Sequence, residues 1–164
     1  LFITVVLSWA FISFAKLSGM FGEEVFYLVN IAGQDINFQG LLLAGIIIGC
    51  LGVLDDVVIA QVVTVEQLIK ADNTQSKKEV FKKAYQVGIS HISSMTNTLF
   101  LAYAGASIPL LILFTSGESA FSSWGQIINN EAIATEIVRT LVGSIGLILS
   151  VPIATWLAVW KLKK

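Results

Sequence analysis

The sequence is poor in the residues that build disulfides, metal sites and sharp turns. Its 164 residues include one cysteine, one histidine and two prolines. The single cysteine, Cys50, excludes an intramolecular disulfide, and its Ile- and Leu-rich surroundings favour a buried, inert thiol. No histidines and cysteines recur at metal-ligand spacing, so we expect neither a metal nor another cofactor.

Charged residues are also scarce. They make up 13% of the chain, the formal net charge is −1, and there is no long basic stripe, so nucleic acid is not an expected partner. What is abundant is apolar sequence, at 55% hydrophobic residues with a mean hydropathy of +0.82. This composition predicts an integral membrane protein. The first residue is Leu1 instead of Met, which indicates an excerpt of a longer chain.

Four apolar runs approach or reach the roughly 20 residues that a membrane-spanning helix needs. We therefore predict an all-α fold, a helical bundle in a single membrane domain over 1–164, with spans at about 1–18, 38–63, 89–115 and 137–160. Lysines are concentrated in the connection after the second run and at the C-terminus, whereas the connections 19–37 and 116–136 are acidic. The positive-inside rule then places both ends of this chain in the cytoplasm.

The lysine-rich connection contains a helix signal. Ser76 and Glu79 have the spacing of a capping box, and apolar residues recur at helical spacing after them. We predict an amphipathic helix at about 76–88 on the cytoplasmic membrane surface. The alternative is that this segment extends the third span into water.

Two adjacent aspartates, Asp55 and Asp56, lie within the second apolar run. An ionised carboxylate inside a bilayer costs at least about 2.5–3.5 kcal/mol, so such a group is protonated, paired, or turned toward protein or water. Gly45, Gly49, Gly52 and Asp56 follow one another at spacings of 4, 3 and 4, so they share one helix face, and Asp55 lies about 100° away. Because small residues let helices approach closely, we expect Asp56 to point into a helix interface. The alternative is that one aspartate only fixes the register of neighbouring helices.

The third run offers polar neighbours for these aspartates. Ser90, Ser94, Asn97 and Thr98 form a seam at helical spacing, and the amide of Asn97 needs a partner on another helix if it is buried. Much of this seam could equally be ordinary packing, since serine and threonine bond their own helix. At the start of the fourth run, Glu136 and Arg139 are three residues apart and form a candidate intrahelical ion pair.

Enzymatic chemistry is not expected. An intramembrane aspartyl protease needs aspartates on two facing helices, whereas Asp55 and Asp56 belong to one run. A serine protease needs its histidine on a different helix from the nucleophile, but His91 shares a run with the candidate serines.

Three stretches carry a family resemblance: GVLDDVVIAQ, NTLFLAYAGA and EIVRTLVGSIG. With these the chain resembles the YibE/F-like family of bacterial multispan membrane proteins. More distantly, it is similar to half of the transmembrane unit of resistance-nodulation-division transporters and SecD/SecF export proteins. That resemblance implies a proton-relay role for Asp55 and Asp56. It also implies a second membrane half, a homologous partner chain or a homo-oligomer to supply what this chain lacks.

The resulting expectation is a permease-like protein of the bacterial cell membrane. Asp55 and Asp56 would form its ion or proton relay, with Asn97 as their polar neighbour. The competing hypothesis is a membrane scaffold or assembly factor in which the aspartates only hold helices together. No substrate follows from the residues.

Overall fold

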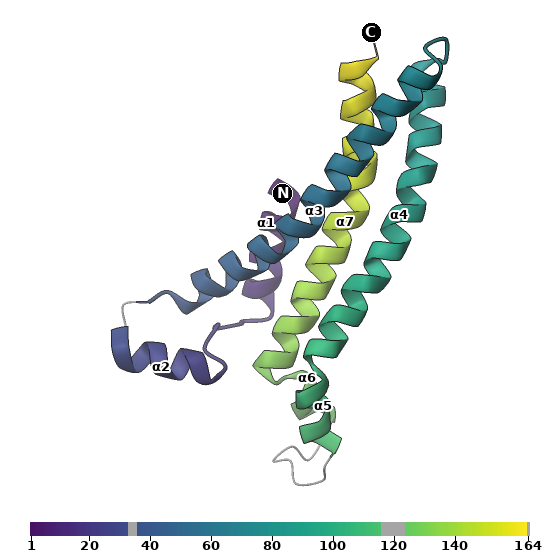
Figure 1. The fold of residues 1–164 in the computed structure, drawn as a ribbon. Coiled ribbons are helices and arrows are strands. Elements are labelled where there is room, and N and C mark those ends of the chain that lie inside the picture. Colours follow the sequence, from purple (N-terminus) through teal and green to yellow (C-terminus); the bar gives the residue numbers. More distant parts are fainter. Residues whose placement is uncertain (33–35, 116–123, 164) are drawn as a thin grey trace.

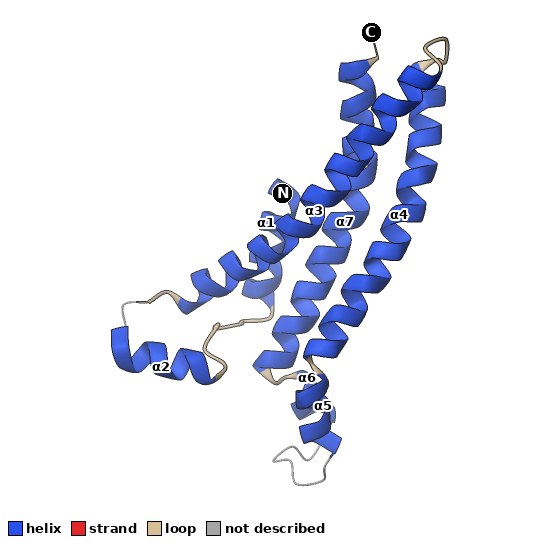
Figure 2. Ribbon diagram, viewed as in Figure 1, coloured by secondary structure: helices blue, strands red, loops and turns tan. Residues whose placement is uncertain are grey.

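Helices are the only regular elements in the part of the chain that the structure describes, residues 1–32, 36–115 and 124–163. Figures 1 and 2 show the computed structural model, in which the predicted all-α fold is confirmed. The helices are α1 (Phe2–Phe14), α2 (Glu23–Ala32), α3 (Phe38–Ala71), α4 (Lys77–Ala106), α5 (Ile108–Thr115), α6 (Trp124–Ile128) and α7 (Glu131–Leu162).

Three long helices, α3, α4 and α7, form the body of the molecule, and α1 packs against α3 and α7 (Figure 1). Their contacts form three apolar clusters along the bundle. One joins α1, α3 and α7 around Ile46 and Val142, one joins α3, α4 and α7 around Val57 and Leu147, and one lies near the lysine-bearing end around Val65. The buried stripe of each long helix, at three- and four-residue spacing, thus contributes to clusters along the length of the bundle.

Two helices in the described ranges, α3 and α7, are long and apolar enough to cross a membrane. They contain the predicted spans 38–63 and 137–160. The predicted first span, 1–18, is a 13-residue helix that stops at Phe14, and Lys16 beyond it has a positive φ of 52°. At ~1.5 Å per residue this helix is about 20 Å long, shorter than the roughly 30 Å hydrocarbon layer.

The prediction of a separate surface helix at 76–88 is wrong. The capping box forms as predicted, with Ser76 and Glu79 bonded to each other, but the helix that it starts continues without a break to Ala106. Val80, Ala84, Gly88 and Ile92 are all buried, so one packed stripe runs through the whole segment. Packing of this stripe against α3 and α7 holds the segment in the bundle as the first three turns of α4.

The third predicted span, 89–115, is divided between two helices. α4 ends at Ala106, Ser107 follows, and α5 begins at Ile108 directly before Pro109. Pro109 takes a first-turn position, where its missing N–H leaves no helical bond unmade. α2 lies in the connection 19–37, for which the sequence predicted no helix. Asp35 and Glu118, two acids of the predicted outer connections, lie outside the described residues.

Candidate functional site

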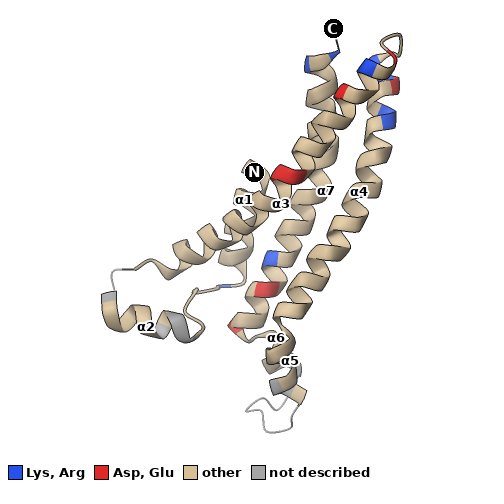
Figure 3. Ribbon diagram, in the orientation of Figure 1, with Lys and Arg blue, Asp and Glu red and all other residues tan. Residues whose placement is uncertain are grey.

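The two aspartates lie halfway along α3, at the acidic band in the middle of that helix in Figure 3. Asp55 is the eighteenth of the 34 residues counted from Phe38. Both side chains are exposed on the chain, and neither forms a hydrogen bond or ion pair with the described residues. The aspartates are therefore two unpartnered carboxylates in the middle of a helix that is long and apolar enough to cross a membrane.

The glycine stripe that leads to Asp56 also faces outward. A Cβ atom placed on Gly45, Gly49 or Gly52 would meet nothing within 4 Å. The described helices of this chain therefore do not pack on the stripe, and the expected helix interface at Asp56 is not formed inside the chain. A close approach by a helix from elsewhere stays a prediction.

Asn97 forms no hydrogen bond with either aspartate. Its side chain is exposed on α4 and shows no hydrogen bond to the described residues. Two hydroxyl groups of the seam bond their own helix, Ser90 to the Gln86 carbonyl and Thr98 to the Ser94 carbonyl. The seam is thus an exposed polar surface of α4 and not a buried contact with α3.

Glu136 and Arg139 lie close together on α7, with Arg139 Nη1 3.2 Å from Glu136 Oε1. Both side chains are about 30% exposed, but Glu136 Oε2 and Arg139 Nε are buried without a hydrogen-bond partner among the described residues. The pair sits one turn inside α7, toward the end of the bundle opposite the lysines (Figure 3).

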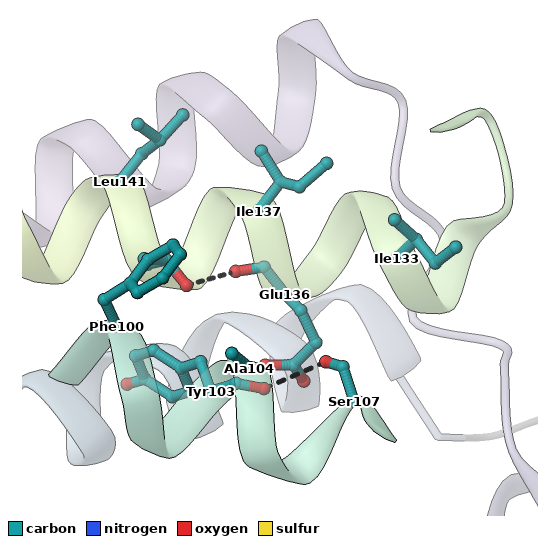
Figure 4. Close-up of a pocket in the computed structure, with 9 residues that line it drawn as sticks. Phe100, Tyr103, Ala104, Ser107, Ile133, Glu136, Ile137 and Leu141 are labelled. Atoms are coloured by element: carbon teal, nitrogen blue, oxygen red, sulfur yellow. Dashed lines mark hydrogen bonds between the residues drawn. The ribbon is translucent and has the colours of Figure 1, made fainter. Parts of the chain in front are cut away.

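A cavity of about 400 Å³ lies beside Glu136, between α4 and α7. Its lining residues are mainly apolar: Phe100, Tyr103, Ala104, Ser107, Ile133, Glu136, Ile137, Thr140 and Leu141. Figure 4 shows Glu136 reaching from α7 toward α4, while the hydroxyl of Ser107 donates to the carbonyl oxygen of Tyr103 in its own helix. The cavity therefore offers apolar surface and few free polar groups.

One buried polar contact was missed at the sequence level. Gln61 of α3 is only 2% exposed, and its Nε2 donates to the Ala84 carbonyl of α4 and to Thr155 Oγ1 of α7, both at 2.7 Å. A single amide thus joins the three long helices. The sequence does contain a signal for this contact, because Gln61 continues the spacing of the buried residues Leu54 and Val57.

A second missed contact joins the connection after α1 to the start of α7. The carboxylate of Glu131, in the first turn of α7, accepts hydrogen bonds from the backbone N–H groups of Ser18 and Gly19 and from the hydroxyl of Ser18. Sequence separation hides such a contact, since Ser18 and Glu131 are 113 positions apart in the numbering. In the described residues, no group of three or more His, Cys, Asp or Glu side chains could hold a metal ion.

Comparison with known proteins identifies the family. The model of the YibE/F-like protein family matches residues 1–164. The chain belongs to the YibE/F-like family. No curated protein and no solved structure matches the chain. The resemblance to YibE/F-like proteins is thereby confirmed over the whole chain, while the more distant similarity to resistance-nodulation-division and SecD/SecF proteins stays a prediction.

Proposed function

We propose that this YibE/F-like chain is part of a multi-pass, permease-like protein of the bacterial cell membrane, with Asp55 and Asp56 as its ion- or proton-responsive centre. The observation that carries the proposal is the position of these two carboxylates. At ~1.5 Å per residue, the 34 residues of α3 measure about 51 Å, so Asp55 lies about 26 Å from its first residue. A hydrocarbon layer about 30 Å thick that is centred on α3 therefore contains both aspartates.

A carboxylate at that depth has two alternatives. It binds a proton and becomes neutral, or it stays ionised and is covered by cations, polar groups or water. Two adjacent carboxylates that form no ion pair with a described residue can exchange protons or cations as the groups around them change. This exchange is the chemistry that an ion-coupled permease requires, and the proposal assigns the chain no catalytic reaction.

Membrane placement is supported by the apolar lengths of α3 and α7 and by the lysines of α3, α4 and α7, which gather at one end of the bundle (Figure 3). That end includes Lys70 at the end of α3, Lys77 at the start of α4 and Lys161 near the end of α7. With the lysine-bearing end in the cytoplasm, the positive-inside rule is satisfied. We propose the cytoplasmic side for the C-terminus, while α1 runs from Leu1, beside Leu54 and Val58 at mid-depth, toward the opposite end of the bundle (Figure 1).

The experiment measures proton flux in vesicles that contain the reconstituted full-length protein and an internal pH-sensitive dye. Asp56→Asn is expected to abolish flux while the protein stays folded and assembled, and Asp55→Asn is expected to cause a smaller or equal loss. Glu66→Gln is the matched control, because it removes a carboxylate from α3 nearer the lysine-bearing end, where Glu66 pairs with Lys70. Flux unchanged by Asp56→Asn would refute ion coupling through this residue.

The second candidate function is a membrane scaffold or assembly factor. It is favoured by the exposed glycine stripe at Gly45, Gly49 and Gly52, since such a surface suits close packing of a further helix. This hypothesis predicts that either aspartate substitution impairs assembly, and that the correctly assembled fraction conducts no protons in the wild type. The same reconstitution, with the assembled fraction measured by size-exclusion chromatography, separates the two functions.

A further inference from the structure

Asp56 and the glycines lie on the side of α3 that adjoins α4. Val53 and Val57 pack in one cluster with Ile92 and Met95 of α4. Residues that are three or four apart lie nearly above one another on a helix, so Gly49 and Asp56 flank Val53 on the exposed surface. Leu54 and Val58 mark the opposite side of α3, because they line a cavity together with α1 residues.

Three polar side chains of α4 lie on the same exposed surface. Tyr103 and Ser107 line the cavity with α7 and so mark the α7 side of α4. Angles around α4 can be measured from Met95 at about 100° per residue. His91 and Ser94 then lie about 40° and 100° away from Met95, in the direction opposite to Tyr103 and Ser107. Asn97 follows at about 160°. All three are exposed, and their side chains form no hydrogen bond with any described residue.

Together these residues define what we call the α3/α4 polar face: Gly49, Gly52 and Asp56 of α3 with His91, Ser94 and Asn97 of α4. It combines an uncovered carboxylate with uncovered hydrogen-bond donors on the part of the bundle where lipid would otherwise lie. Lipid satisfies neither. In the membrane placement proposed above, a protein surface therefore has to cover this face.

We propose that the α3/α4 polar face binds the same face of a second copy of the chain, with α3 of each copy packed against α4 of the other. The face is self-complementary, because α3 supplies the acceptor and α4 the donors, which is the requirement for a two-fold symmetric contact. Packing α3 on α3 would instead place Asp56 beside its symmetry mate, and like charges in a desolvated contact repel. The glycines leave room for the helix of the second copy.

Depth in the membrane supports this pairing. Two contacts show which residues of α3 and α4 lie at the same depth. Gln61 of α3 bonds Ala84 of α4. Cys50 of α3 and Leu99 of α4 both lie beside Gly143 of α7. Between these levels, Asp56 lies level with His91 and Gly52 lies level with Asn97. A two-fold axis along the membrane normal preserves depth, so each group of α3 meets its matching level on α4 of the other copy.

The test is disulfide formation between two differently tagged copies of the full chain, each carrying Cys50→Ala, one with Gly52→Cys and the other with Asn97→Cys. After co-expression and oxidation in membranes, the proposal predicts a doubly tagged dimer, because a disulfide needs Cα atoms within about 7 Å. The control pair joins Gly52→Cys to Ile148→Cys, an exposed α7 position outside the face. Crosslinking at the control level refutes the contact.

A second pair, Gly49→Cys with Leu101→Cys, tests the same contact if the first pair folds poorly. Both positions are exposed, and a Cβ on Gly49 meets no atom of the described residues within 4 Å. Several-fold more dimer than the control supports the proposal, whereas capture of a different protein or of no protein overturns it. The inference rests on the proposed membrane placement but not on ion coupling. Crosslinked copies without proton flux leave the contact standing and refute only the coupling.

Discussion

The amide of Gln61 is a quantitative test of how α3, α4 and α7 are held together. Replacement by leucine keeps most of the side-chain volume and removes the two bonds from Nε2, to the Ala84 carbonyl and Thr155 Oγ1. Neither partner is stranded. The Ala84 carbonyl lies within α4, in its third turn, and Thr155 Oγ1 still donates to the Val151 carbonyl at 2.6 Å.

The expected cost of Gln61→Leu is small. Side-chain hydrogen bonds between membrane helices contribute about 0.6 kcal/mol each on average, so the loss of two destabilises the fold by about 1.2 kcal/mol. Gln61→Ala also leaves a gap in a site that is 2% exposed, and comparable truncations cost about 2–5 kcal/mol. Gln61→Glu should be the most harmful at neutral pH, because a carboxylate would face two oxygen atoms in the core.

The assay is unfolding of the purified protein in mixed detergent micelles, followed by helicity as the denaturing detergent is increased. Gln67→Leu on the exposed side of α3 is the matched control and should change the free energy of unfolding by less than about 0.5 kcal/mol. If Gln61→Leu proves as costly as Gln61→Ala, the two hydrogen bonds and not the filled volume stabilise this point of the bundle, and the small cost expected for Gln61→Leu is refuted.

Further predictions concern glycine, thiol and carboxylate groups. Gly146→Ala would drive its Cβ into an α1 side chain and should cost about 1–3 kcal/mol, whereas Gly45→Ala meets nothing and should be neutral or stabilising in the same unfolding assay. Cys50 is buried and should react with a maleimide only after unfolding, as mass spectrometry would show; rapid reaction in the folded protein would contradict the α3 packing. Hydrogen bonds from the Ser76 backbone and hydroxyl lower the pKa of Glu79, so the cap stabilises the start of α4 at neutral pH and is lost as pH falls through that lowered value. Amide exchange in the first turn of α4 should therefore accelerate in acid, and Glu79→Gln should remove that dependence.

Sequence periodicity predicted the local structure of individual segments better than it predicted their packing partners. Some features depend only on neighbours within one or two helical turns, and the sequence predicts them directly. They are the long apolar stretches of α3 and α7 and the cap at Ser76 and Glu79. The segment 76–88 was misjudged because its amphipathic stripe suits a membrane surface and a bundle core equally well. Only the packing of Gly88 against Val151 and Gln61 decides between them.

The same limit applies to the candidate site. Helical phase correctly separates Asp55 from Asp56 and groups Asp56 with Gly49 and Gly52, since those relations are fixed by the geometry of one helix. Which face of α3 packs against a neighbour depends on where the other helices lie. The core of this chain is built on a different stripe of α3, through residues such as Ile46 and Val57, and this leaves the aspartates outside.

This separation of the core from the carboxylates bears on function. Ile46, Val57 and Val65 are fully buried and hold α3 in the bundle, while Asp55 and Asp56 contribute no contact to it. An aspartate kept only for stability within this chain would be expected to bond a neighbouring helix, as Gln61 does. Because neither carboxylate does so, neutralising one should change the free energy of unfolding of the isolated chain by less than about 0.5 kcal/mol. Any larger effect of Asp56→Asn in a membrane must then arise from a proton, an ion or a second protein surface at this face, which is where both proposals place it.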